Sequence, residues 1–419
     1  MSTSTKKFAL TEDWTVVILG FSIILITILG FLLPVPSFGW SNSSELFEKV
    51  LSVENLQKIL IQLVAVVVVA VAGAALLGNS IKPFLTGLPI VYVLTILALI
   101  ITGNSAVKDL NLEAVIFSLI IGLVIGNTIK LPDWLKASLS TEVFVKIGLV
   151  LLGTGVIFSD ILKAGSLGLI QALLVVISVW YFAFWISKKM GIDEEMGIML
   201  SSAVSICGVS AAIATSGAIK GDSKKLSYVI SLVLITAIPM MIFMPYIAKA
   251  LSLSEEVTGA WLGGTIDTTG AVVASGSMVG EIALKTSTIV KFSQNVLLGV
   301  AAFAISIYWT YTNNPLAKDN ETRPSLGIIW ERFPKFVLGF VAASLLFSFV
   351  IPADTVSAVK GSLKNFQGLW FALAFTSIGL ETNFSDLFNK DSRKPLYAFL
   401  IAQTFNIFIT LIIAYFLFR

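Results

Sequence analysis

A single carboxylate flanked by hydroxyl groups stands in the stretch GGTIDTTGAVVASG. Asp267 follows Thr265 and precedes Thr268 and Thr269, with glycines on both sides. A carboxylate at membrane depth is costly, so it indicates an ion pathway, a proton relay or a cation site. Two roles suit Asp267: a carrier that takes up and releases a proton, or a ligand for a hard cation such as sodium. The alternative is an aspartate at a loop tip, in contact with water.

A second stretch, LSSAVSICGVSAAIATSGAIKGD, is rich in small and hydroxyl-bearing residues. The candidates within it are Ser205, Cys207, Gly208 and Ser210. Small side chains let backbones approach closely, and Gly208 allows a helix to open, so that freed N–H groups at a helix N-terminus can hold an anion. The alternative is a tightly packed interior helix. If both stretches re-enter the membrane from opposite faces, their tips meet near its middle and form a substrate site.

Polar residues near the second stretch extend the candidate site. Lys291, Gln294 and Asn295 have the spacing of one helix face. A buried Lys291 would attract an anion, whereas a lysine at a helix end would extend toward water. Glu381 is predicted to take part in ion coupling at the cavity, or to lie at a helix end.

Several function classes are excluded by residues that the chain lacks. It has no histidine, and its one cysteine, Cys207, permits no internal disulfide. Zinc chemistry and a Ser-His-Asp site are therefore excluded, and we predict neither an enzyme nor a metal centre nor a cofactor beyond coupling to sodium or a proton. A net charge of +3 without a basic stripe argues against nucleic-acid binding.

The elements that carry these residues are predicted to be membrane helices. The chain is 56% hydrophobic and 13% charged, with a mean hydropathy of +0.93, whereas soluble chains carry about 25% charged residues. Its apolar runs are long enough to cross the bilayer as helices, and a β-barrel would show short alternating segments instead. We predict an all-α polytopic membrane protein with about eleven spanning helices. The predicted spans are 14–34, 59–78, 84–102, 113–129, 142–160, 167–187, 225–247, 286–311, 336–351, 364–385 and 396–417.

The two candidate stretches fall in segments that interrupt this pattern, 195–217 and 257–279, and these are predicted to be broken or re-entrant. The distribution of Lys and Arg favours re-entrance and a cytoplasmic N-terminus in a bacterial inner membrane. We predict core and scaffold domains. Their parts are an N-terminal helix with an amphipathic extension (1–57), scaffold helices (58–140), a core transport region (141–311), a polar loop (312–335) and a second set of helices (336–419).

An internal repeat indicates inverted architecture. VLLGTGVIFSDIL (150–162) resembles FTSIGLETNFSDLF (375–388). An odd number of predicted crossings separates the copies, so they face opposite ways, as in secondary transporters. The alternative is chance similarity between apolar helices.

With these residues in view, the chain resembles the YeiH-like family of membrane proteins that are named as sulfate exporters. The resemblance covers roughly 84–417 and is carried by VKIGLVLLG (145–153), SICGVSAAIA (205–214), GGTIDTTGAVVASG (263–276) and TIVKFSQNVLL (288–298). It implies a place among transporters such as bile-acid symporters and sodium/proton antiporters, with elevator-type alternating access. Family members carry histidine where Asp267 stands and a basic residue where Gln294 stands, so the roles of those two residues do not transfer.

These observations lead to one main hypothesis, a secondary active transporter of a small anion such as sulfate or a sulfonate. The predicted substrate-binding residues are Ser205, Cys207, Gly208, Ser210, Thr265, Thr268, Thr269 and Lys291, and the predicted ion-coupling residues are Asp267 and Glu381. A sodium/proton-type cation exchanger using Asp267 is the alternative, followed by a membrane subunit without transport activity. The expected partners are the anion, membrane lipid and a second copy in a homodimer.

Overall fold

The structure is a computed structural model that describes residues 10–109, 114–219, 221–313, 327, 330, 333–382 and 393–419. Within these ranges the chain is helical, and the one β pairing is an isolated bridge between Trp40 and Asn104. Helices are expected in hydrocarbon because they satisfy every backbone polar group within one segment. The prediction of an all-α fold is confirmed.

Five of the described helices are long and apolar enough to cross a membrane. They are α3 (Val53–Leu76), α10 (Phe158–Lys189), α13 (Ser223–Ala250), α16 (Glu281–Asn313) and α20 (Arg393–Phe418). Shorter apolar helices accompany them. The chain is therefore a polytopic membrane protein, while the larger number of about eleven spans stays a prediction.

Contacts divide the chain into two compact units. Unit 1 comprises Met1–Phe158 and Lys335–Asn383, and unit 2 comprises Ser159–Pro334 and Phe384–Arg419. Every predicted site residue except Glu381 belongs to unit 2. The functional division into scaffold and core regions stays a prediction.

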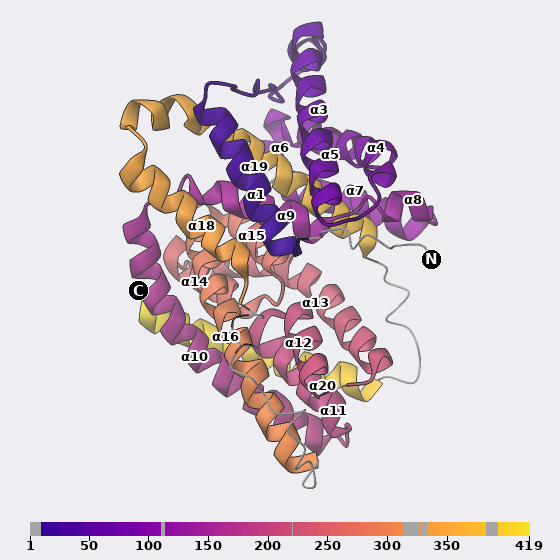
Figure 1. Cartoon of the computed structure of the whole chain (residues 1–419), viewed down its shortest axis with the longest axis vertical. Coiled ribbons are helices and arrows are strands. Elements are labelled where there is room, and N and C mark those ends of the chain that lie inside the picture. The colour runs from indigo at the N-terminus through magenta and orange to yellow at the C-terminus, as the bar shows by residue number, and fades with distance from the viewer. Residues whose placement is uncertain are drawn as a thin grey trace, which may run out of the picture. The chain divides into compact units, whose positions relative to one another are not determined.

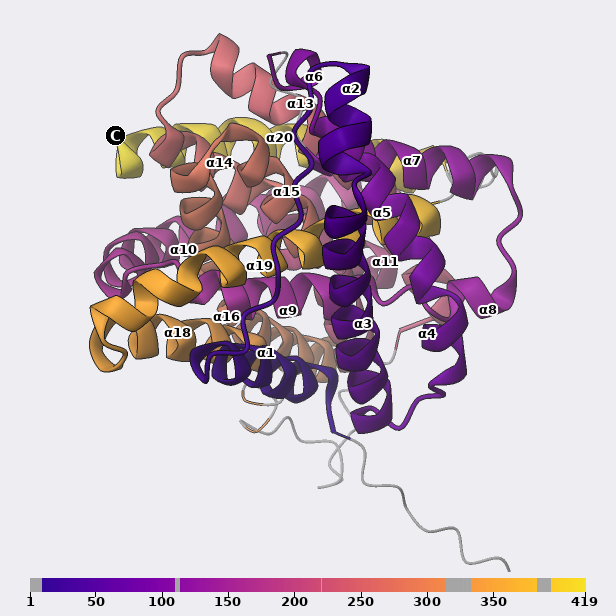
Figure 2. The ribbon, with the colours of Figure 1, turned by 90° about the horizontal axis from the view of Figure 1, so that it is seen from above.

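In unit 1, α19 (Ala353–Glu381) packs against α7 (Ala114–Thr128) and α9 (Thr141–Gly153), and α1 (Glu12–Ile28) packs against α18 (Lys335–Leu345) (Figure 2). Glycine permits the tightest of these contacts. A Cβ added at Gly379 would lie 2.4 Å from the carbonyl oxygen of Leu119, so α19 and α7 touch through their backbones.

The predicted span 142–160 is divided in the structure. α9 ends at Gly153, and α10 begins at Phe158. A Cβ at Gly153 would lie 2.3 Å from the carbonyl oxygen of Phe340, so α18 approaches α9 where the helix ends. The first copy of the internal repeat therefore spans a helix break. The matching Phe-Ser-Asp of the second copy lies outside the described residues.

A half-buried lysine fixes the first helix of unit 1. Lys146 Nζ lies 2.6 Å from Glu12 Oε1 and 3.1 Å from Asp13 Oδ1. The backbone N–H of Lys335 donates to Asp13 Oδ2 at 2.8 Å. α1, α9 and α18 are thus joined by one charge network.

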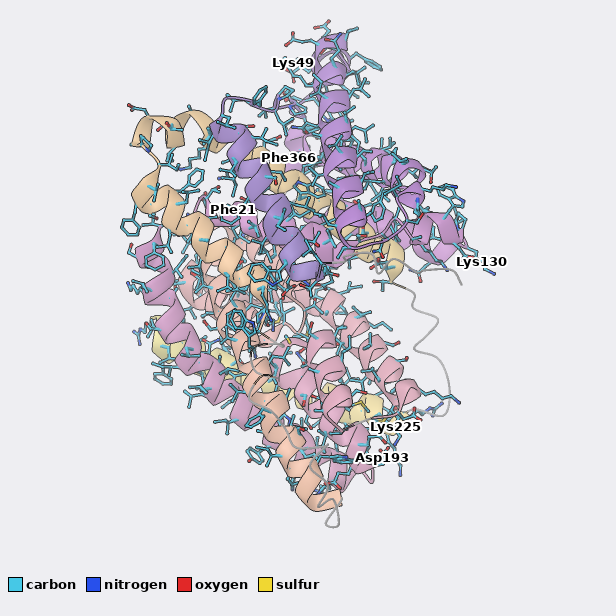
Figure 3. The ribbon with its side chains drawn as sticks, viewed as in Figure 1. Phe21, Lys49, Lys130, Asp193, Lys225 and Phe366 are labelled. Carbon is cyan, nitrogen blue, oxygen red and sulfur yellow. The ribbon has the colours of Figure 1, made fainter. Side chains whose placement is uncertain are left out.

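Lys146→Met is expected to destabilise unit 1, because it removes the cation shared by Glu12, Asp13 and, at 3.9 Å, Glu142. Removing one member of a partly buried pair costs about 2–3 kcal/mol, which should appear as a lower unfolding temperature in detergent. Lys49→Met is the matched control, because the Lys49–Glu45 pair at 2.6 Å is exposed (Figure 3) and within one helical turn. Equal unfolding temperatures for both variants would show that the charge network around Lys146 does not stabilise unit 1.

Unit 2 contains the broken helices and the long helices around them. The first segment consists of α11 (Glu194–Ser202), the π-helix η2 (Ala203–Cys207) and α12 (Val209–Ile219). The second consists of α14 (Glu255–Thr265) and α15 (Thr269–Val279). α12 packs against α13 (Figure 1), and α15 packs against both α13 and α16.

Helix caps and ion pairs fix the exposed ends of these segments. Asp193 caps α11 by accepting the N–H of Met196 at 3.1 Å. Lys225 Nζ, at the start of α13, lies 2.7 Å from Asp193 Oδ1 (Figure 3). The N–H groups of Lys225 and Lys224 donate to the Asp222 carboxylate and hold its pKa below the ordinary value. The starts of α11 and α13 are therefore joined at the surface.

Candidate functional site

The first broken segment opens at Gly208. η2 ends with the N–H of Gly208 bonded to the carbonyl of Ala203 at 3.0 Å, and Gly208 then adopts φ +62° and ψ −111°. Side chains rarely tolerate this backbone conformation, whereas glycine does. The predicted broken segment 195–217 is thus interrupted at the glycine that the sequence singled out.

The second broken segment opens around Asp267. α14 ends at Thr265, Ile266 is extended at φ −73° and ψ 130°, and α15 starts at Thr269. Thr268 caps α15 because its Oγ1 accepts the N–H of Ala271 at 3.3 Å. Segment 257–279 is therefore also interrupted, and Asp267 lies in the interruption.

The two interruptions touch. A Cβ added at Gly208 would lie 3.1 Å from Cβ and 3.4 Å from the carbonyl oxygen of Asp267, and 2.6 Å from Cγ1 of Val233. η2 and α14 therefore end, and α12 and α15 begin, on either side of the close approach between Gly208 and Asp267. Figure 2 shows α14 and α15 next to each other. The first N–H groups of a helix have no partner within it and carry partial positive charge.

Two residues of α16 bind carbonyls that the interruptions release. Lys291, 1% exposed, donates from Nζ to the carbonyl of Ile206 at 3.0 Å and to Gln294 Oε1 at 2.8 Å. Gln294 Nε2 donates to the carbonyls of Ser205 at 2.8 Å and Gly264 at 3.2 Å. A single side chain, Gln294, therefore bridges both broken helices.

α20 supplies a second bridge that sequence reasoning missed. Asn406 Nδ2 donates to the carbonyls of Val204 at 3.1 Å and Thr265 at 3.2 Å. Gln403 Nε2 also donates to Thr265, at 3.1 Å. The available signal was two amide side chains in an otherwise apolar run. Together with Gln294, they tie the two segments into one body.

The amide nitrogens and the ammonium are occupied in this way, while several oxygens are not. Within the described part of the chain, both carboxylate oxygens of Asp267 are buried without a hydrogen-bond partner, as are Thr265 Oγ1, Asn295 Oδ1 and Gln403 Oε1. Lys291 and the Gln403 amide are close enough to act on the carboxylate, but neither makes an ion pair or a hydrogen bond of ordinary geometry with it in these ranges. The deep part of the site is therefore rich in unpaired acceptors.

The shallow part of the site carries donors. Ser210 is exposed on the first turn of α12, and Thr268 and Thr269 are half-buried at the start of α15. Asn295 Nδ2 donates to Thr269 Oγ1 at 3.3 Å. These three hydroxyls and the two helix N-termini form what we call the donor rim, and oxygen-bearing anions are bound by such groups.

The remaining predicted residues have more local roles. The Ser205 hydroxyl donates to the carbonyl of Ser201 at 2.7 Å, so it is engaged within its helix. Cys207 is buried at the end of η2. Glu381 lies at the end of α19 in unit 1, where Oε2 accepts a hydrogen bond from Thr141 Oγ1 at 2.9 Å.

Two cavities of unit 2 are lined by other residues. One, of about 300 Å³, is mostly apolar, with Trp180, Tyr181 and Tyr308 among its lining. The other, of about 380 Å³, is lined by residues that include Lys163 and Lys285. Neither of these two cavities is lined by a residue of the donor rim.

Comparison with known proteins gives a match over most of the chain. The family described as conserved hypothetical protein 698 matches residues 86–398. The UPF0324 membrane protein RB9488 of Rhodopirellula baltica is 40% identical over 82% of this chain and 64% of its own length. A UPF0324 membrane protein of Nitratidesulfovibrio vulgaris is 38% identical over 83% of this chain and 61% of its own length. The chain thus spans less than two thirds of these relatives, and no solved structure matches it.

Proposed function

Because this chain belongs to the membrane-protein family of conserved hypothetical protein 698, we propose that it carries a small anion across the membrane as a secondary transporter. The membership agrees with the YeiH-like resemblance inferred from the sequence. Sulfate, a sulfonate or a related anion is the proposed cargo. The lack of histidine and of a catalytic pair in the sequence supports a transporter rather than an enzyme.

One observation carries the proposal: α12 and α15 begin on either side of the contact between Gly208 and Asp267. Interrupted helices in secondary transporters direct their N-termini at anionic groups of the substrate. Here the hydroxyls of the donor rim lie at those two termini, and the ammonium of Lys291 binds the carbonyl of Ile206, two residues before Gly208. The anion would bind at the rim, and Asp267 would couple its movement to an ion.

Alternating access would move the two broken helices together. Gln294 joins Ser205 to Gly264, and Asn406 joins Val204 to Thr265. Separating the segments would break at least one hydrogen bond of each bridging amide inside the membrane, where no water replaces it. We therefore propose that the segments and the site between them move as one body, in the elevator manner.

Uptake of labelled sulfate and sulfonates into proteoliposomes tests this function. Asp267→Asn is expected to lower uptake at least about 10-fold, because the ion-coupling charge is lost. Ser210→Ala is expected to raise the KM several-fold, because it removes a hydroxyl from the donor rim. Ser231→Ala is the matched control, since that hydroxyl donates within α13 to the carbonyl of Ser227 at 3.0 Å. Unchanged uptake by both site variants would reject the site.

A cation or proton exchanger is the second candidate, and the unpaired oxygens around Asp267 favour it. In such an exchanger Asp267 carries the ion and no anion moves. The decay of a sodium or pH gradient across proteoliposomes distinguishes the exchanger from the anion transporter. An exchanger dissipates the gradient at the same rate in sulfate, sulfonate or gluconate buffer. Acceleration by one of the first two anions selects the anion transporter.

We also propose a bacterial plasma-membrane location with the N-terminus in the cytoplasm, because re-entrance of both broken segments leaves more lysine and arginine on that side. A reporter that fluoresces only in the cytoplasm, fused before Met1, tests the orientation. A dark fusion that is still inserted in the membrane would reverse it. A homodimer stays a prediction.

A further inference from the structure

The carboxylate of Asp267 is buried in unit 2 without a direct hydrogen bond or ion pair among the described residues. The residue is 1% exposed, and neither oxygen has a hydrogen-bond partner among the residues that the structure describes. Burying a charge in this way is strongly unfavourable unless a counter-ion or a proton joins it. A cation or a proton in direct contact with the carboxylate would relieve this cost.

Lys291 does not fill that role by direct contact. Its Nζ donates to the carbonyl of Ile206 at 3.0 Å and to Gln294 Oε1 at 2.8 Å. Both acceptors are neutral and belong to the bridge between the segments. Lys291 acts on Asp267 only at a distance and leaves the carboxylate oxygens open to a ligand.

Two amide oxygens are held beside the same interruption. Asn295 donates through Nδ2 to Thr269, and Gln403 donates through Nε2 to Thr265. These threonines stand two residues after and two residues before Asp267. Each amide is thus fixed by its nitrogen, and its oxygen is buried and unpaired.

The number and type of these atoms distinguish between ions. Asp267, Asn295, Gln403 and Thr265 together present five buried oxygens without partners in the described ranges, and one proton pairs with only one or two of them. Carboxylate, amide and hydroxyl oxygens are the ligands of hard cations. A single carboxylate near a lysine supplies too little negative charge for a divalent ion, so a monovalent cation fits best.

We infer that Asp267, Asn295 and Gln403 bind a sodium ion in the interruption between α14 and α15. The inference deepens the proposed function, since this ion would be the one coupled to the anion. The cation would bind the buried oxygens around Asp267, and the anion would bind the hydroxyls and N–H groups of the donor rim. Each ion would then contact groups of opposite partial charge.

Thermal unfolding of the full chain in detergent tests the sodium site without any transport. Replacing choline chloride by sodium chloride at constant ionic strength is expected to raise the unfolding temperature by about 5 °C at saturation. Asp267→Asn should abolish the shift. In choline chloride this variant should unfold at the same temperature as the parent or higher, because it lacks a buried carboxylate that no group contacts directly.

Two further variants make the assignment specific. Asn295→Ala should raise the sodium concentration that gives half of the shift at least about 10-fold, because it deletes one ligand oxygen. Asp133→Asn is the matched control, since Asp133 is an exposed aspartate of unit 1, and it should keep the full shift. A shift that persists in Asp267→Asn, or equal unfolding in sodium, potassium and choline, overturns the sodium site.

Failure of this inference is distinguishable from failure of the proposed function. Anion uptake that depends on pH and not on sodium would overturn the sodium site and keep the anion transporter. A sodium-specific shift in a chain that moves no anion would keep the site and remove the anion function.

Discussion

Gly208→Ala is expected to reduce transport at least about 100-fold and to lower stability by about 2–4 kcal/mol. The alanine would have to adopt φ +62° and ψ −111°, which costs about 1–3 kcal/mol for a residue with a side chain. Its Cβ would also lie 2.6 Å from Val233 Cγ1 and 3.1 Å from Asp267 Cβ. Relief of these contacts would push the two interruptions apart and misplace the helix N-termini.

Gly361→Ala provides the matched control for this substitution. Gly361 lies inside α19, and an added Cβ would meet nothing within 4 Å. Alanine in a helix interior is more stable than glycine by about 0.5–1 kcal/mol, so this variant should unfold slightly later and transport normally. The unfolding temperature and anion uptake are measured for both variants. A Gly208→Ala protein as active and as stable as the parent would show that the interruptions need no close contact.

Gln294→Leu is expected to abolish transport and to lower the free energy of unfolding by about 3–5 kcal/mol. The amide makes three buried hydrogen bonds: it donates to Ser205 at 2.8 Å and Gly264 at 3.2 Å, and it accepts from Lys291 at 2.8 Å. Leucine fills a similar volume but leaves both carbonyls unpaired and removes one of the two acceptors of the ammonium. Broken helices in hydrocarbon have no water with which to replace these bonds.

Gln294→Glu separates the two functions of this amide. Glutamate would still accept a hydrogen bond from Lys291 but could donate to neither carbonyl, so transport should be lost although the lysine keeps its acceptor. Gln57→Leu is the control, because Gln57 is exposed on α3, and it should leave uptake and stability unchanged. Transport by the glutamate variant at the parent rate would contradict the proposal that the segments move as one body.

The positions of the helix interruptions were predictable from the sequence because their causes are local. Gly208 and Asp267 lie in stretches of small, polar and glycine residues that interrupt the apolar runs. Such composition disfavours a continuous helix. The residues that close the interruptions were only partly predictable. Lys291 and Gln294 follow the second segment closely enough for helix spacing to group them.

Contacts between distant segments could not be derived in this way. Gln403 and Asn406 lie far along the chain in α20, and only tertiary packing brings them to Thr265. The early end of α9 was missed as well, since the run 142–160 is apolar across the break at which Gly153 lies close to Phe340 of α18. Apolar runs indicate how much helix is present, but they do not indicate where it is interrupted.

The separation of Lys291 from Asp267 has an electrical consequence. Two opposite charges on the same group of helices cancel, so the protein itself carries no net charge through the bilayer when both are ionised. One sodium ion with one sulfonate would then cross as a neutral load, whereas one sodium ion with sulfate would carry a surplus negative charge. Since moving one elementary charge across 100 mV involves about 2.3 kcal/mol, the membrane voltage would act on sulfate and leave the sulfonate unaffected.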